Sequence, residues 1–330
     1  MGPGWPRINR SICIALGTLM LSMTLGCQHR SARGVALEDL KTNEARPLFW
    51  RVQGDRGADL YILSSPNAGG PAGGWSYPPA IEQAFESAQA LVVELDPSEM
   101  TADQTQALVA TYGTLPRGLS LQKELPSDLW TKLAPQLKRA ELPISYADQM
   151  QPWLVQLLLQ AEAMRRLGLS SRNGVDEGFI EEVGDRSIIG LESIKFQIAL
   201  LVRMPIKVQS ASLRHTLTHF ENFEDEVESL VKAWRRGDEQ LLARLLSLDG
   251  SADPPEKTFL ELFTFRRSQS MAEQLGVLLE AEQHRGERVF VVMGIQYLVG
   301  QEGIPALLQE KGYAVKRYSP SALLHALPGG

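Results

Sequence analysis

Cysteine is nearly absent from this 330-residue chain, in which Cys13 and Cys27 are the only two. Both lie near the N-terminus, and Cys13 falls inside an apolar run. If that leading segment is removed, the mature chain holds no cysteine pair for a disulfide, no cysteine metal ligand and no cysteine nucleophile. The sequence therefore excludes disulfide-framed secreted modules, cysteine-type zinc domains and thiol-dependent enzymes.

A strong excess of charge of one sign is also missing. The chain has 33 Lys and Arg against 39 Asp and Glu, a formal net charge of -6, and 22% of its residues are charged. We therefore expect no nucleic-acid partner, because the basic footprint of such proteins is lacking. With 44% hydrophobic residues the chain is not of the disordered class, and it is long enough to bury a substantial core.

No apolar run is long enough to be a typical transmembrane helix. The run Ile12 to Leu25 follows Arg7 and Arg10 and has roughly 14 residues, whereas a spanning helix needs roughly 20. It ends in Thr24-Leu25-Gly26-Cys27, which resembles a bacterial lipobox, although threonine stands where leucine is usual. We predict a signal peptide over residues 1–26 and a lipid on Cys27. Plain secretion with an incidental cysteine and a retained anchor are the alternatives.

The segment after Cys27 bears on where such a lipoprotein would reside. Gln28 follows the cysteine, and the absence of Asp there gives no reason to expect inner-membrane retention in an envelope with two membranes. Residues 27–46 are polar and aperiodic and predict a lipidated tether. The expected place is the bacterial cell envelope, at the outer membrane or the periplasmic face, with the lipid bilayer as one partner.

From residue 47 the pattern is globular, and we assign residues 47–320 to a single domain with a tail at 321–330. Strands are predicted where short apolar or alternating runs are bounded by turn residues. They cover Leu48 to Val52, Leu60 to Leu63, Ala90 to Leu95, Ser187 to Glu192, Val289 to Met293 and an edge strand Tyr313 to Tyr318.

Apolar residues at helical spacing fill most of the remaining chain. Predicted helices cover Pro79 to Ala90, Trp153 to Leu167, Glu192 to Arg203, Ser212 to Arg236, Glu239 to Leu248, Thr258 to Glu282 and Pro305 to Lys311, with Gly237 as a natural breaker. Strands at both ends of the chain and a long helical middle predict an α+β fold. Its central mixed sheet would be formed by the N- and C-terminal segments, with the helical part across it.

Several landmarks in this order resemble the TraB/GumN family. They are Leu48-Phe49-Trp50-Arg51-Val52, Leu91-Val92-Val93-Glu94-Leu95-Asp96, Gln151-Pro152-Trp153, Gly174-Val175-Asp176, Ile189-Gly190-Leu191-Glu192 with Gln197, Ala233-Trp234-Arg235-Arg236-Gly237-Asp238, Arg267 with Met271-Ala272, and the stretches Gly303 to Leu308 and Lys311 to Val315. The family (TraB/PrgY/GumN) includes plasmid pheromone-shutdown proteins and the Tiki proteins, which are membrane-anchored metal-dependent peptidases. The resemblance implies a TraB/Tiki-like fold.

The resemblance also implies a metal-dependent hydrolase site built from two Gly-x-x-His motifs and nearby acidic residues. Here the first motif reads Ser64-Ser65-Pro66-Asn67 and the second reads Gly294-Ile295-Gln296-Tyr297. Asn67 and Tyr297 thus stand where the family has its two histidines. An amide oxygen suits calcium better than zinc, manganese or cobalt, and a phenol must lose a proton with an ordinary pKa of about 10 to coordinate well.

Other family positions are kept. Glu94 and Glu192 match acidic residues of the family, and Asp176 and Arg267 also match, whereas the family's Glu-Arg-Asn reads Arg266-Arg267-Ser268. Two buried acids without a metal must be protonated, hydrogen-bonded or paired, and Arg267 is the available partner. We therefore favour a structural ion pair over an acid/base role for Glu94 and Glu192.

The resulting hypothesis is a catalytically inactive pseudo-hydrolase that binds a peptide or an envelope protein. Asn67, Glu94, Asp176, Glu192, Arg267 and Tyr297 form its remnant cleft, with no catalytic residue, metal or cofactor. The alternative is a metal-dependent peptidase or other hydrolase with atypical ligands, using a divalent metal such as Mn or Co.

Three other patterns are weaker indications of a functional site. His215 and His219 share one face of a predicted helix and could bind zinc or copper with a third ligand, although solvated helix histidines are the simpler interpretation. Ser64 has no His/Asp arrangement of a serine hydrolase beside it. The stretch Gly69 to Gly74 lacks the lysine of a phosphate-binding loop and predicts only an irregular loop.

Overall fold

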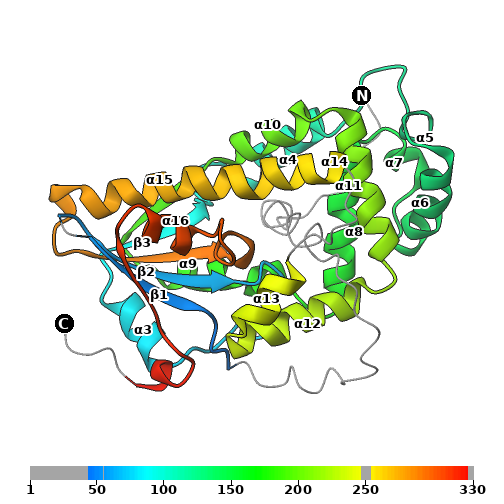
Figure 1. Cartoon of the computed structure of the whole chain (residues 1–330). Coiled ribbons are helices and arrows are strands. Elements are labelled where there is room, and N and C mark those ends of the chain that lie inside the picture. The colour runs from blue at the N-terminus through cyan, green and yellow to red at the C-terminus, as the bar shows by residue number, and fades with distance from the viewer. Residues whose placement is uncertain (1–43, 55, 247–253, 326–330) are drawn as a thin grey trace.

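The protein is built around a six-stranded mixed sheet with strand order β4-β3-β5-β2-β1-β6. The computed structural model describes residues 44–54, 56–246 and 254–325 (Figure 1). The strands are β1 (Phe49–Gln53), β2 (Asp59–Ser65), β3 (Ala90–Leu95), β4 (Ser187–Glu192), β5 (Arg288–Gly294) and β6 (Ala314–Arg317). All six lie within one or two residues of the predicted strands, and the predicted α+β class with a sheet joining both ends of the chain is confirmed.

Strand direction decides where a site can form. β1 pairs antiparallel with β2 and with β6. β2, β5, β3 and β4 pair parallel to one another in that order. The carboxyl ends of these four parallel strands therefore meet at one edge of the sheet. β3 and β5 are apolar almost throughout because neighbouring strands flank them and helices cover their faces.

Two groups of helices enclose the sheet. On one face lie α3 (Pro79–Glu86) and α9 (Val175–Glu182), and on the other α15 (Arg266–Glu280) and α16 (Ile304–Glu310) (Figure 1). Phe179 of α9 fixes the first group, because its ring centroid lies 4.8 Å from those of Phe85 in α3 and Phe290 in β5. Such tilted and edge-to-face pairs stabilise beyond their buried area.

The remaining helices gather at one end of the sheet (Figure 1). They are α4 (Ala102–Tyr112), α5 (Leu121–Glu124), α6 (Ser127–Arg139), α7 (Ile144–Ala147), α8 (Pro152–Arg166), α10 (Ile194–Arg203), α11 (Ile206–His219), α12 (Phe223–Arg236), α13 (Glu239–Leu245) and α14 (Pro254–Leu260). Between α8 and α11 a buried polar contact fixes the packing: Gln156 donates to the Thr216 hydroxyl at 2.9 Å and accepts from that of Ser212 at 2.5 Å.

One predicted helix, Ser212 to Arg236, is wrong as a single element. α11 ends at His219 and α12 begins at Phe223, with Asn222 at φ -100° and ψ 0° in the turn between them. Phe220 and Phe223 are both buried and their rings stack at 5.8 Å. The break lets both rings reach the core. Glu221 and Asn222 lie between the two rings, and without a glycine or proline they provide no turn signal in the sequence.

A second long predicted helix, Thr258 to Glu282, contains a change of hydrogen-bonding pattern. Its first part belongs to α14, residues Glu261–Phe265 form a π-helical segment, and α15 follows at once. Single π turns inside α-helices are frequent at functional sites. This one ends two residues before Arg267.

The predicted breaker Gly237 ends α12 in the left-handed conformation, at φ 63°. Three residues earlier, the buried Trp234 indole donates to the Ser64 backbone carbonyl at 2.8 Å and ties α12 to the end of β2. In the part of the chain that the structure describes, no helix is long and apolar enough to cross a membrane. The predicted signal peptide and Cys27 lie outside the described residues, whereas Ala45, at the end of the predicted tether, is buried on the domain.

Candidate functional site

The six residues of the predicted remnant cleft gather at the carboxyl ends of the parallel strands. Glu94 lies near the end of β3, Glu192 ends β4, and Ser65 and Gly294 are register partners at the ends of β2 and β5. Ligands of open α/β sheets bind at this edge. We call Asn67, Glu94, Asp176, Glu192, Arg267 and Tyr297 the strand-end cluster.

Arg267 is the centre of this cluster. Its Nε lies 2.8 Å from Glu192 Oε1, its Nη2 lies 2.6 Å from Glu192 Oε2, and the same Nη2 lies 3.4 Å from Glu94 Oε2. The side chains of Arg267, Glu192 and Glu94 are only 3%, 4% and 9% exposed. One buried guanidinium therefore joins α15 to β3 and β4, as the ion-pair interpretation predicted. Breaking such a pair leaves an uncompensated buried charge, which is strongly destabilising.

A second donor reaches each of the two carboxylates. The Gly294 backbone N–H donates to Glu94 Oε1 at 2.8 Å, and the Gln197 amide of α10 donates to Glu192 Oε2 at 2.8 Å. Each carboxylate thus accepts from Arg267 and from a second donor. Every carboxylate oxygen of Glu94 and Glu192 therefore accepts at least one hydrogen bond.

A second polar group surrounds Asn67. The Ser65 hydroxyl donates to Asp176 Oδ2 at 2.8 Å and also lies 3.2 Å from Asn67 Oδ1. The Asn67 amide nitrogen lies 3.4 Å from Gln296 Oε1. Asn67 has φ 51°, a left-handed conformation that asparagine tolerates better than most residues. Asn67 is half-buried, whereas the other three residues of the first motif, Ser64 to Pro66, are buried.

Tyr297 lies on the β5 side of the cluster, three residues after that strand ends. It is fully buried, and its ring lies 4.9 Å from the Arg267 guanidinium carbon, a cation–π contact. Its pKa lies well above the ordinary value because burial penalises the phenolate, and Glu94 and Glu192 add to this although Arg267 opposes it. The neighbouring Gln296 side chain also opposes the rise in the pKa of Tyr297. A neutral phenol is a poor metal ligand.

Burial also raises the pKa values of the acids. The pKa of Glu94 is raised to about 7, by burial first and then by Asp176 and Glu192, against the lowering effect of Arg267 and the Gly294 N–H. Burial raises the pKa of Asp176, which its Ser65 hydrogen bond opposes. The next residue, Glu177, has a pKa of about 8, raised by burial and then by Asp176. Burial thus favours the protonated form of each of these three carboxyl groups.

The residues present do not fit the divalent metal that the family resemblance implies. Metal ligation needs free lone pairs from imidazole or carboxylate, and an open position for water. Here Arg267 places a positive charge between the carboxylates of Glu94 and Glu192, and Asn67 and Tyr297 supply no imidazole. Over the described ranges, no three His, Cys, Asp or Glu side chains are placed to share a metal ion.

Several partners in the cluster were not predicted as site residues. Ser65 and Gln296 lie inside the two degenerate motifs, and Glu177 directly follows a family landmark. Their contribution depends on loop geometry after the strands, which the motif spacing alone does not describe. Gln197 was a landmark of the resemblance, and the structure shows the contact it makes.

The histidine pair lies away from this edge, on α11. The rings of His215 and His219 lie 4.7 Å apart, His215 Nδ1 lies 3.5 Å from Glu256 Oε1, and His219 Nδ1 lies 3.8 Å from Glu226 Oε1. The expectation of solvated histidines is wrong for His215, whose side chain is only 11% exposed because it packs beside α14.

Comparison with known proteins places the chain in a family. YbaP of Escherichia coli K12, described as uncharacterised, is 25% identical over 159 residues, which are 48% of this chain and 57% of YbaP. The chain thus spans little more than half the length of YbaP. An uncharacterised protein of Treponema pallidum is 23% identical over 249 residues, 72% of this chain and 71% of that protein. No solved structure matches the chain. The sequence model of the TraB/PrgY/gumN family matches residues 48–317, from the start of the sheet to the end of β6, and the chain therefore belongs to the TraB/PrgY/gumN family.

Proposed function

We propose that this protein is an envelope lipoprotein whose strand-end cluster no longer hydrolyses and instead binds a peptide or a partner protein. The observation that carries the proposal is the position of Arg267 between Glu94 and Glu192. A hydrolase of this type needs carboxylates free to hold a metal that activates water. With both carboxylates held by one buried guanidinium, the cluster is suited to stability and recognition.

The less buried end of the cluster supplies the recognition chemistry. The amides of Asn67 and Gln296 face each other at 3.4 Å, a long contact that a ligand group can replace. Each amide has both donors and an acceptor, so the pair matches the alternating N–H and C=O groups of a peptide backbone. Burial of Gln296 keeps its amide in place beside Asn67.

A second candidate is a metal-dependent peptidase or other hydrolase with atypical ligands, using Mn or Co. The pKa of Glu94 near 7 favours it, because a general base works best when its pKa lies near the operating pH. The separating experiment measures metal content of the purified protein and then cleavage of peptide substrates with added manganese or cobalt.

The expected result is no stoichiometric metal and no metal-dependent cleavage. Peptide cleavage that disappears in Glu94→Ala and in Glu192→Ala, together with bound metal in the wild type, would establish the hydrolase instead. Binding is followed separately: Asn67→Ala should weaken capture of a bound peptide. Alanine is less favourable than asparagine at φ 51°, by about 1 kcal/mol, so circular dichroism must show that the variant is still folded.

The lipoprotein part of the proposal rests on the Gly26-Cys27 junction after a short apolar run. It is tested by labelled palmitate and membrane fractionation of the wild type and Cys27→Ala. We expect the label only in the wild type, and release of the variant from membranes. An unlabelled wild type with a variant that still pellets with membranes would contradict lipidation.

A further inference from the structure

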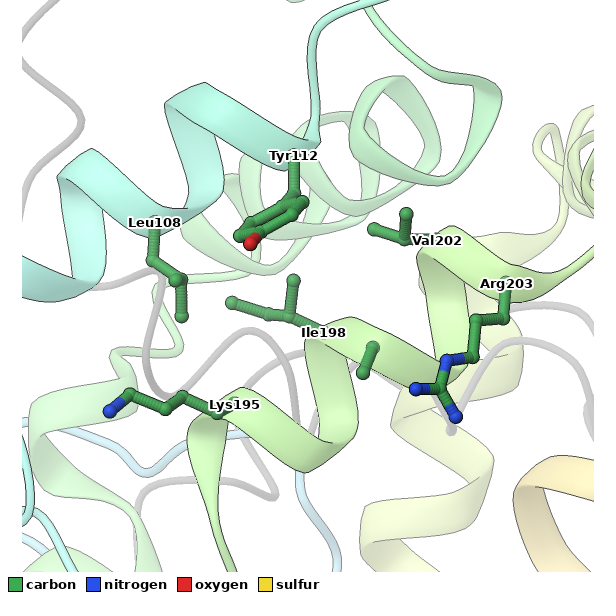
Figure 2. Close-up of a pocket in the computed structure, with 7 residues that line it drawn as sticks. Leu108, Tyr112, Lys195, Ile198, Val202 and Arg203 are labelled. Carbon is green, nitrogen blue, oxygen red and sulfur yellow. The ribbon is translucent and has the colours of Figure 1, made fainter.

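A groove on the outer side of the helical part lies between α4 and α10, with a cavity volume of about 360 Å³. Leu108 and Tyr112 of α4 form one wall, and Ile198 and Val202 of α10 form the other (Figure 2). Cavities of this size hold small ligands or a few side chains of a partner. The strand-end cluster does not use any of these residues.

The groove combines an apolar floor with an exposed aromatic side chain. Ile198 is buried at its base, whereas Tyr112 is 47% exposed at its rim. A large aromatic side chain held open to solvent at the rim of a groove is typical of protein–protein contact surfaces.

Two cations mark the ends of the α10 wall. Lys195 and Arg203 both line the groove, with Ile198 and Val202 between them (Figure 2). Eight residues of an α-helix correspond to about 12 Å along its axis. Neither cation has an ion-pair partner among the described residues, although the chain as a whole is acidic. Both charges are therefore available to a ligand.

We infer that this groove binds an acidic amphipathic helix of a partner protein. An apolar face of such a helix, with residues at i, i+3 or i+4 and i+7, fits a groove between two helices. Two acidic residues about eight positions apart on the partner helix would meet Lys195 and Arg203, because both helices have the same rise per residue. A fatty acid, which has one carboxylate and one acyl chain, would contact only one of the two cations.

The inference is tested with designed helical peptides and the full-length protein, by fluorescence anisotropy. One peptide has an apolar i, i+3, i+4, i+7 face and two Glu eight positions apart, and its twin has Lys at those two positions. Wild-type protein should bind the acidic peptide saturably and at least about tenfold more tightly than the twin. Lys195→Glu with Arg203→Glu should reverse this preference, which a general loss of stability would not do.

Two further variants complete the design. Lys123→Glu with Lys311→Glu makes the same change of net charge at exposed positions elsewhere and should change affinity less than about twofold. Tyr112→Ala removes an exposed aromatic ring from the α4 wall of the groove. It should weaken binding by about fivefold without altering the circular dichroism spectrum.

Absence of saturable binding of the acidic peptide, or equal binding of both peptides by the wild type, would overturn the inference. So would preference for phosphatidylglycerol vesicles over the peptide, lost in the Lys195→Glu, Arg203→Glu variant, since that would assign the groove to a membrane surface.

Discussion

Glu94 and Gly294 meet across the sheet although they lie 200 positions apart in the chain: the Gly294 N–H donates to the Glu94 carboxylate at 2.8 Å. The contact joins the end of β3 to the end of β5, so the N- and C-terminal parts of the chain complete one edge. It also fixes the backbone that leads into Gln296 and Tyr297.

Gly294 should tolerate no side chain without displacing the amides beside it. A Cβ at this position would lie 2.3 Å from Asn67 Nδ2 and 2.6 Å from Gln296 Nε2, although φ of -58° is open to any residue. We expect Gly294→Ala to lower the free energy of unfolding by about 1 kcal/mol, because only the ends of two side chains must move. Urea unfolding measures this, and the loss should shrink in an Asn67→Ala background.

A matched glycine provides the control. Gly178 lies within α9, and a Cβ there would meet nothing within 4 Å. Gly178→Ala should therefore raise the free energy of unfolding by up to about 1 kcal/mol, the helix-propensity difference between the two residues. Similar losses for both substitutions would contradict crowding at Gly294.

Removing the Arg267 guanidinium should be among the most destabilising single changes. Arg267→Met leaves Glu94 and Glu192 buried without their cation, which costs about 3–5 kcal/mol of unfolding free energy at neutral pH. Its neighbour Arg266 pairs with Glu261 at 2.8 Å, but both side chains are more than half exposed. Arg266→Met should therefore cost less than about 1 kcal/mol. Urea unfolding of the two variants side by side tests this, and equal costs would contradict the central role of Arg267.

The sequence predicted much of this edge because its chemistry is local. The strand of Glu94 is a buried apolar run that ends in an acid, and an Arg was the available partner for two buried glutamates. The resemblance to the family supplied which distant segments belong together. What could not be predicted is the hydrogen bond from Ser65 to Asp176, since it depends on how the loop after β2 meets the start of α9.

Two predicted helices, Ser212 to Arg236 and Thr258 to Glu282, differ from the structure because of contacts that are distant in the sequence. The turn between α11 and α12 has neither glycine nor proline, and it forms because two phenylalanines must both reach the core. The π segment before Arg267 changes the hydrogen bonding without interrupting the apolar spacing. Tertiary packing decided both features, and local sequence preferences did not reveal them.

The raised pKa of Glu94 predicts a pH-dependent stability. The pKa is about 7 in the folded protein against an ordinary value of 4.5, so between these values the folded state binds more protons than the unfolded state. Stability from this group is full below pH 4.5 and is lost as pH rises through 7. Gln does not titrate. The unfolding free energy of Glu94→Gln minus that of the wild type should therefore rise across this window, by up to about 3 kcal/mol.

Urea unfolding at several pH values from 4 to 8 measures the difference. Glu310→Gln, at an exposed position of α16, controls for the loss of one negative charge. A Glu94→Gln curve parallel to the wild type would contradict the raised pKa. A difference that falls with pH would mean that the carboxylate is stabilised by Arg267 more than it is penalised by burial.

The last prediction concerns restoration of a metal site. Asn67→His with Tyr297→His supplies two imidazoles, and histidine is among the residues that accept the left-handed conformation of position 67. We expect this double variant to bind manganese, cobalt or zinc only weakly, because Arg267 still holds both carboxylates. Adding Arg267→Gln should free Glu94 and Glu192 and tighten binding by at least about tenfold.

Isothermal titration of the wild type, the double variant and the triple variant tests this, with Arg266→Gln in place of Arg267→Gln as the matched control. Equal affinity of the double and triple variants would show that Arg267 does not block the site. Negligible binding by all three would show that the two strand-end loops cannot direct ligands to one point. Tight binding by the wild type would instead favour the hydrolase, because the carboxylates would then exchange Arg267 for a metal without any new imidazole.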